Sequence, residues 1–202
     1  MHLPAPLAAE LAALAERYGP PALVEAAIPD GVFNPVSQRD RVGEVCMVIR
    51  RPSGRLLTVR KTFYPAGVMR LPTGGIGHGE PIEAALLREV AEETSLAVAV
   101  RRLLAVIAYR APETPPGLDA FYTFAFLLDE LGGELIVQDP DERVEAFGEA
   151  APAELPALAA ALAALDEQVD REIGGSWGSW GVVRAAAHLA AARALRAAAG
   201  ER

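Results

Sequence analysis

Residues 74–96 join a glycine-rich loop to a helix with repeated acidic residues, and this segment constrains the fold more than any other. The helix is predicted over residues 81–94, where Glu89, Glu92 and Glu93 stand at i, i+3 and i+4 and share one face. Like charges at this spacing destabilise a helix by roughly 0.2–0.5 kcal/mol per pair. Arg88 compensates part of this charge, and Mg²⁺ compensates it better, because Mg²⁺ binds carboxylates while keeping positions for water and phosphate oxygens.

The rest of the chain predicts strands around this helix and further helices at both ends. Ile82, Leu86 and Val90 form an apolar row that can pack the acidic helix against a sheet. The predicted strands are residues 42–50, 55–61, a short one ending at Leu71-Pro72, 96–109, 119–128, 134–137 and 143–148. The other predicted helices are residues 5–17, an alanine-rich stretch from 152 onward and 182–199. This order predicts a mixed α/β domain.

Charge and hydropathy exclude two classes of partner. The 19 basic and 27 acidic residues give a formal net charge of −8, which argues against a general nucleic-acid binder. Charges interrupt every apolar run before it reaches membrane-spanning length, and the N-terminus lacks the basic region of a signal peptide. The single cysteine, Cys46, excludes an internal disulfide and favours a reducing compartment. We therefore expect a cytoplasmic protein that binds neither nucleic acid nor membrane.

The segment 74–96 resembles the Nudix box, the signature of the Nudix hydrolase family. The matching residues are Gly74, Glu80, Arg88, Glu89, Val90, Glu92, Glu93 and Leu96. Ser95 is the one departure, because the family has glycine there. If that position requires a positive φ, serine costs about 1 kcal/mol. Since Ser95 removes no metal ligand, we expect an altered helix end and an intact metal site.

The resemblance implies a Nudix-type α/β/α sandwich with a mixed sheet, extended by N- and C-terminal helices. It divides the chain into an N-terminal helix and connection (1–40), the Nudix hydrolase domain (41–165) and a C-terminal helical extension (166–202). We expect the added helices to cover the sheet edges or to build a homodimer.

The resemblance also implies a role for each matching residue. Glu89, Glu92 and Glu93 would ligate Mg²⁺ or Mn²⁺, with the backbone carbonyl of Gly74 completing the shell. Arg88 would orient the glutamates, and Glu80 would support the start of the box. The general base in the family is a box glutamate, such as Glu92 or Glu93, or a glutamate from a later loop. The loop candidate here is Glu142, with Glu145 as the alternative.

The implied reaction is metal-dependent hydrolysis of a nucleoside diphosphate linked to another group. Arg60, Lys61 and Arg70 are candidates for contacting substrate phosphates. ADP-ribose or a similar nucleotide sugar is the favoured substrate. Two positions depart from the family's enzymes that act on nucleotide sugars, because Arg70 stands where they often have glutamate and Pro112 lies one residue later than their proline. Dinucleoside polyphosphates and nucleoside triphosphates stay open, as does a non-hydrolytic nucleotide-binding or regulatory module. We expect specificity to come from the loops 28–41 and 111–118, with the C-terminal helices as a further candidate.

The remaining conspicuous residues receive structural interpretations. We expect His78 to face solvent and Cys46 to be a small buried side chain. Trp177 and Trp180 should fill a gap between helices or lie at a dimer contact. Arg184 and His188, spaced i, i+4 on the last helix, are expected on a polar helix face.

Overall fold

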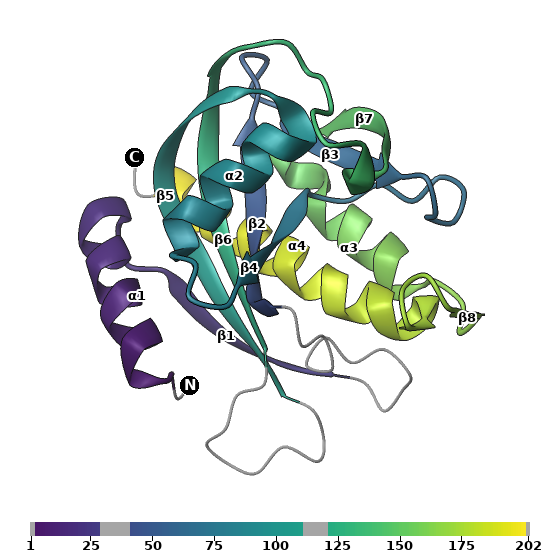
Figure 1. The fold of residues 1–202 in the computed structure, drawn as a ribbon, viewed down its shortest axis with the longest axis horizontal. Helices are drawn as coiled ribbons and strands as arrows, with labels where there is room; N and C mark the ends of the chain where they lie inside the picture. Colours follow the sequence, from purple (N-terminus) through teal and green to yellow (C-terminus); the bar gives the residue numbers. More distant parts are fainter. Residues whose placement is uncertain (1–2, 29–40, 111–120, 201–202) are drawn as a thin grey trace.

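The computed structural model describes residues 3–28, 41–110 and 121–200 and shows three layers, with a sheet between two helical layers (Figure 1). The helices are α1 (Ala5–Tyr18), α2 (Ile82–Thr94), α3 (Leu155–Ala163) and α4 (Trp177–Gly200). The strands of the main sheet are β1 (Ala22–Ala27), β2 (Arg41–Arg50), β3 (Leu56–Lys61), β4 (Thr73–Gly77), β5 (Ala97–Arg110), β6 (Phe121–Gly132) and β7 (Val144–Ala150). A short hairpin of β8 (Val169–Asp170) and β9 (Gly175–Ser176) leads into α4.

The sheet is mixed, as the sequence predicted. Its strand order is β1-β5-β6-β2-β3-β7, and β4 pairs with the first half of β2. The β1–β5 and β6–β2 pairs are parallel, and the other pairs are antiparallel. The sheet therefore places β4, which carries the first glycines of the box, beside the central strand β2.

Strand β2 is buried on both faces, and its side chains alternate between the two cores. Val45, Met47 and Ile49 pack into the core under α1 and α2. Cys46 and Val48 pack into the core under α3 and α4. Because side chains alternate along a strand, one continuous apolar run supplies both layers.

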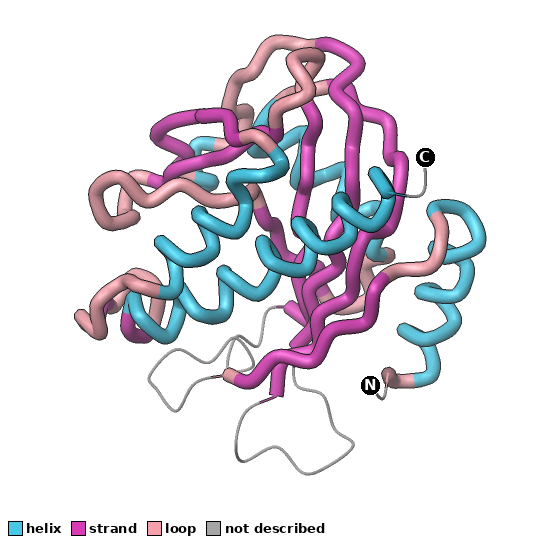
Figure 2. The backbone as a smooth tube through the Cα atoms, turned by 180° about the vertical axis from the view of Figure 1, so that it is seen from behind, coloured by secondary structure: helices cyan, strands magenta, loops and turns pink. Residues whose placement is uncertain are grey.

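The two helical layers are held by different contacts. Ile82, Leu86 and Val90 of α2 are at most 2% exposed, which confirms the predicted apolar row. On the opposite face α3 and α4 pack closely (Figure 2), since a Cβ at Gly181 would lie 2.0 Å from the carbonyl oxygen of Leu162.

Among the described residues, no helix is both long and apolar enough to cross a membrane.

The structure confirms the α/β/α architecture with terminal helices and differs from the sequence prediction in several elements. The first part of the predicted glycine-rich loop is strand β4, which pairs with β2. Residues 22–27, which carried no strand prediction, form β1 and pair in parallel with β5. Residues 134–137 form no strand. The loops 28–41 and 111–118, expected to give specificity, lie almost entirely outside the described residues, and the three-segment division of the chain stays a prediction.

The C-terminal turn of α2 fixes the loop that follows β6. Ser95 ends the helix in the left-handed conformation, with φ 58° and its N–H donating to Ala91. Its hydroxyl donates a hydrogen bond of 2.7 Å to the carbonyl of Ile136. The carbonyls of Thr94 and Glu92 accept hydrogen bonds from the N–H groups of Ile136 and Gln138, at 3.1 and 3.0 Å. The serine thus adopts the positive φ that was expected to strain it and adds a bond to the loop.

His188 joins α4 to the chain just before the box. Its Nε2 accepts a hydrogen bond of 2.9 Å from the N–H of Leu71, and its Nδ1 lies 2.9 Å from the carbonyl of Arg184, so the ring is neutral with the proton on Nδ1. Burial lowers the pKa of His188 to about 4, and the nearby charges of Arg70 and Arg184 act in the same direction. The last helix is therefore bonded into the core.

Substitutions of Ser95 separate backbone strain from the side-chain hydrogen bond. We expect Ser95→Ala to be less stable than Ser95→Gly by about 1 kcal/mol, because both lose the bond to Ile136 and only alanine keeps the strain. Ser95→Gly should lie within about 1 kcal/mol of the parent, since relief of strain offsets the lost bond. Urea unfolding measures all three proteins, and equal stability of the two variants would contradict a strained Ser95.

The burial of neutral His188 makes stability depend on pH. The unfolded chain binds a proton at this residue below its ordinary pKa of 6.5, whereas the folded chain binds it only near pH 4. The free energy of unfolding therefore falls as the pH drops from 6.5 toward 4, by about 3 kcal/mol. Urea unfolding at pH 7 and 5 should show a smaller loss for His188→Gln than for the parent. The same loss in both proteins would exclude this origin.

Candidate active site

Three carboxylates from two parts of the chain converge at the end of α2. Ligand oxygens of Glu89, Glu93 and Glu142 all lie within 4.8 Å of one another. Glu89 and Glu93 are one helical turn apart and buried, and Glu93 is 0% exposed. Glu142 is half-buried in the 3-10 turn Pro140–Glu142, which follows the loop fixed to the end of α2. The hydrogen bonds at the end of the helix therefore bring Glu142 to the acidic pair.

Gly74 is required by close approach to the acidic helix. A Cβ at this position would lie 2.0–2.2 Å from the carboxylate end of Glu89, a distance that no real contact has. Only glycine lets β4 lie against this side chain. The predicted contribution of the Gly74 carbonyl to a metal shell stays a prediction.

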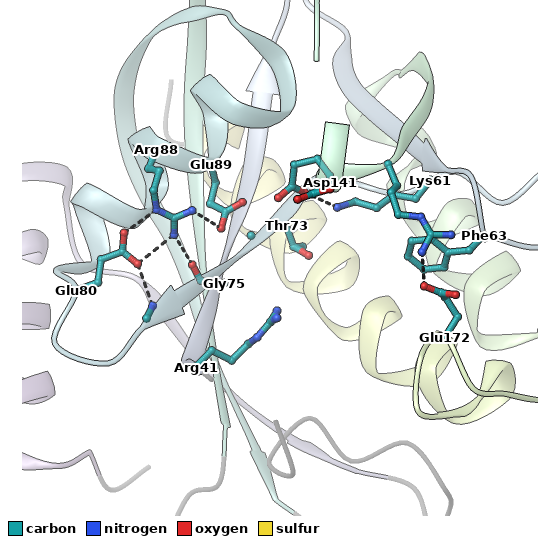
Figure 3. A pocket seen from close by; sticks show the side chains of 14 residues that line it. Arg41, Lys61, Phe63, Thr73, Gly75, Glu80, Arg88, Glu89, Asp141 and Glu172 are labelled. Carbon is teal, nitrogen blue, oxygen red and sulfur yellow. Dashed lines mark hydrogen bonds and ion pairs between the residues drawn. The ribbon is translucent and has the colours of Figure 1, made fainter. Parts of the chain in front are cut away.

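Arg88 holds the carboxylates along one side of the site (Figure 3). Its Nε and Nη2 donate to the two oxygens of Glu80, at 2.8 and 3.0 Å. Its Nη1 donates to Glu89 and Glu92, at 2.9 and 2.8 Å, and its Nη2 also donates to the carbonyl of Gly75, at 2.9 Å. The hydrogen bond from Arg88 lowers the pKa of Glu80, so Glu80 stays ionised. One guanidinium thus orients three glutamates and the strand beneath them.

Lys61 is the cation on the other side of the site. Its Nζ lies 2.7 Å from Glu142 and 3.0 Å from Glu93. Burial raises the pKa of Glu93 to about 7, against the opposing charges of Lys61 and Arg70. Burial also acts to raise the pKa of Glu142, but the hydrogen bond and charge of Lys61 outweigh it and keep that pKa below its ordinary value. Glu142 is therefore ionised at neutral pH.

The acidic cluster fits a divalent cation by its chemistry. Both carboxylate oxygens of Glu93 are buried and accept no regular hydrogen bond from the described residues. Burial also raises the pKa of Glu89, although Arg88 opposes this. Oxygen atoms of converging carboxylates are the ligands that Mg²⁺ and Mn²⁺ prefer. A hard divalent cation would satisfy the oxygens of Glu93 and offset the cost of burying them.

The cluster opens into a cavity of about 540 Å³ (Figure 3). Its walls come from β2, β3, β4, α2 and the turn around Glu142. The predicted residues that line it are Gly74, Glu80, Arg88, Glu89, Lys61 and Glu142. Arg41 and the ion-paired Arg143 and Glu172 line it as well, and no sequence pattern marked them.

Several predicted residues lie elsewhere. Glu92 is paired with Arg88 and is not part of the converging cluster, so its predicted role as a ligand stays a prediction. Arg60 and Glu145 form an ion pair of 3.0 Å with each other, and neither lines this cavity. His78 is exposed, as expected.

Of the two predictions made for side chains of α4, one is confirmed and one is wrong. Trp177 and Trp180 are 3% exposed and pack edge-to-face against Tyr64, so they fill a gap as expected. The polar helix face expected for Arg184 and His188 is wrong, because His188 bonds the chain before the box and Arg184 forms an ion pair with Glu44. The missed partner was Glu44, whose sequence cue is an acidic residue within an apolar strand. Cys46 is buried, as expected.

Comparison with known proteins agrees with this geometry. A family model describing the NUDIX domain matches residues 40–172, more than half of the 202 residues. An ADP-ribose pyrophosphatase of Methanocaldococcus jannaschii is 36% identical over 100 residues, which cover 50% of this chain and 57% of the relative. The chain thus matches little more than half the length of that relative.

Two solved structures are also similar. A MutT NUDIX hydrolase from Burkholderia pseudomallei is 30% identical, with a TM-score of 0.42, and the match covers 57% of this chain and 86% of the other. An ADP-ribose pyrophosphatase from Streptococcus suis is 20% identical, with a TM-score of 0.40, and the match covers 55% and 73%. The match of the family model over most of the chain shows that this protein belongs to the NUDIX domain family.

Proposed function

We propose that the protein is a divalent-metal-dependent pyrophosphohydrolase that cleaves a nucleoside diphosphate linked to another group. The observation that carries this proposal is the convergence of Glu89, Glu93 and Glu142, with Glu93 fully buried and facing a single cation, Lys61, at 3.0 Å in the described structure. A surface used only to bind a nucleotide has no need of three carboxylates at such close range.

Glu89 and Glu93 would hold Mg²⁺ or Mn²⁺, with Glu142 facing them. The bound cation would supply neutralisation of the diphosphate oxygens and polarisation of a water molecule. Arg88 keeps Glu89 in position through Nη1. The predicted ligand Glu92 would act through Arg88, to which it is bonded.

Glu142 is the proposed general base. Its low pKa leaves a carboxylate oxygen ready to accept the proton of the attacking water at neutral pH. Lys61, which lies beside Glu142 and lines the cavity, would then bind phosphate oxygens. Glu145 is the weaker candidate for the base, because Arg60 pairs with it outside the cavity.

ADP-ribose is the first substrate to test, because the relative from M. jannaschii is an ADP-ribose pyrophosphatase. Dinucleoside polyphosphates and nucleoside triphosphates belong in the same panel. The cytoplasmic location and the homodimer stay predictions.

Activity is tested with Mg²⁺ and this panel, with products followed by chromatography. We expect turnover of at least one substrate and its loss on chelation of the metal. Glu142→Gln should lower kcat by about 10²–10⁴-fold, because it removes the base, whereas Glu145→Gln should stay within a few-fold of the parent. Equal losses in these two matched variants would contradict the assignment of the base.

Metal binding is measured separately by calorimetry. Glu93→Gln should weaken binding of Mn²⁺ at least tenfold, since it removes a buried charge from the cluster. Its control is Glu145→Gln, which should bind as the parent does. Normal Mn²⁺ binding without turnover of any substrate would instead support a non-hydrolytic module.

A further inference from the structure

A second cavity of about 160 Å³ adjoins the acidic site. Both cavities are lined by Arg41, Lys61, Phe63, Thr73 and Glu172, so they share a wall. The residues that line the second cavity and not the first include Glu44, Tyr64, Arg70, Trp180 and Arg184. The volume corresponds to about five water molecules at ~30 Å³ each, which is the scale of a phosphate group rather than of a nucleoside.

The guanidinium of Arg70, which lines this cavity, has bonding capacity that its contacts within the described structure do not use. The side chain is 3% exposed, yet it forms no ion pair with a described carboxylate. Its Nε donates to the hydroxyl of Tyr64 at 2.5 Å, and its Nη1 donates to the carbonyl of Leu71 and the hydroxyl of Thr73, at 2.7 and 3.0 Å. Nη2 has no acceptor among the described residues. A buried guanidinium without a counterion is costly unless an anion joins it.

The charges around this cavity favour an anion. Four cationic side chains line it, Arg41, Lys61, Arg70 and Arg184, against the two carboxylates of Glu44 and Glu172. Both carboxylates are already engaged, Glu44 by Arg184 and Glu172 by Arg143. A metal at the acidic cluster would further reduce the negative charge near Lys61 and Arg70. Lys61 is paired with Glu93 and Glu142, and Arg184 is paired with Glu44, so the charge that the described carboxylates leave without an ion pair is that of Arg70.

The walls hold Arg70 in place before a ligand arrives. The guanidinium carbon of Arg70 lies 5.4 Å from the ring centre of Tyr64, which packs edge-to-face on Trp177 and Trp180 of α4. A planar fork fixed in this way suits the oxygen atoms of phosphate and loses little freedom on binding.

We propose that the second cavity is a phosphate subsite, in which Arg70 Nη2 binds a phosphate group that the substrate carries in addition to the diphosphate held at the acidic cluster. This inference rests on the proposed hydrolase function. It favours the nucleoside triphosphates and dinucleoside polyphosphates of the substrate panel over ADP-ribose, which carries no phosphate beyond its diphosphate. The shared wall at Lys61 and Thr73 would let one ligand occupy both cavities.

Binding is tested first, without turnover, by calorimetry with inorganic phosphate on the full chain. We expect Arg70→Gln and Arg70→Lys each to weaken phosphate binding at least tenfold, because lysine keeps the charge and loses the fork. Arg101→Gln, an exposed arginine on β5 outside both cavities, is the matched control and should bind as the parent does. Thermal unfolding of each variant identifies any that fails to fold, and the conservative Arg70→Lys then decides. Unchanged phosphate affinity in folded Arg70→Lys would overturn the subsite.

Turnover is tested next with pairs of nucleotides that differ by one phosphate, ATP against ADP and diadenosine triphosphate against diadenosine diphosphate. The parent should favour the member with the additional phosphate at least tenfold in kcat/KM, and Arg70→Lys should lose this preference. An equal loss for both members of a pair would overturn the subsite. If no compound is hydrolysed while phosphate binding still depends on Arg70, the hydrolase proposal fails and the subsite stands.

Discussion

The acidic site depends on cations that neutralise carboxylates lying close together and largely buried. Glu89 and Glu93 lie one turn apart on a helix that is buried against the sheet, and the loop from β6 adds Glu142. Arg88 on one side and Lys61 on the other supply the opposing charge. Arg88 also bonds the carbonyl of Gly75, so the same cation that orients the acids ties α2 to β4. The same contacts of Arg88 therefore compensate the charge of the glutamates and hold α2 against the sheet.

The last helix lines the second cavity, which adjoins the acidic site. Arg184 reaches Glu44 on β2, and His188 receives the N–H of Leu71 directly before the box. Trp180 packs on Tyr64, whose hydroxyl accepts a hydrogen bond from Arg70. Apart from the bond between Arg70 and Tyr64, these contacts link residues more than a hundred positions apart. Together they position Arg70 and Arg184 in the wall of the cavity that adjoins the acidic site. The alanine-rich composition of α4 allows this close approach to the sheet.

Ser95 shows how a departure from a family pattern can be accommodated. The position does take a positive φ, which is the reason glycine suits it. The serine keeps that conformation and gives its hydroxyl to Ile136, in the loop that leads to Glu142. The strain of the backbone is thus met by a bond that a glycine could not make.

The sequence by itself determined the box helix, its acidic and apolar faces, the mixed α/β class and the family. These follow from local spacing, since residues three and four apart must share a helix face and alternating residues must share a strand face. It also singled out Glu142, Lys61 and Arg70 as candidates without showing which others they would meet. Only the tertiary structure decided that Glu142 rather than Glu145 faces the cluster, that Glu92 turns to Arg88, that Arg184 pairs with Glu44 and that His188 is buried. Those outcomes depend on contacts between segments that are far apart in the chain. The local sequence around a side chain has no periodic pattern that shows the burial or charge of such a distant partner.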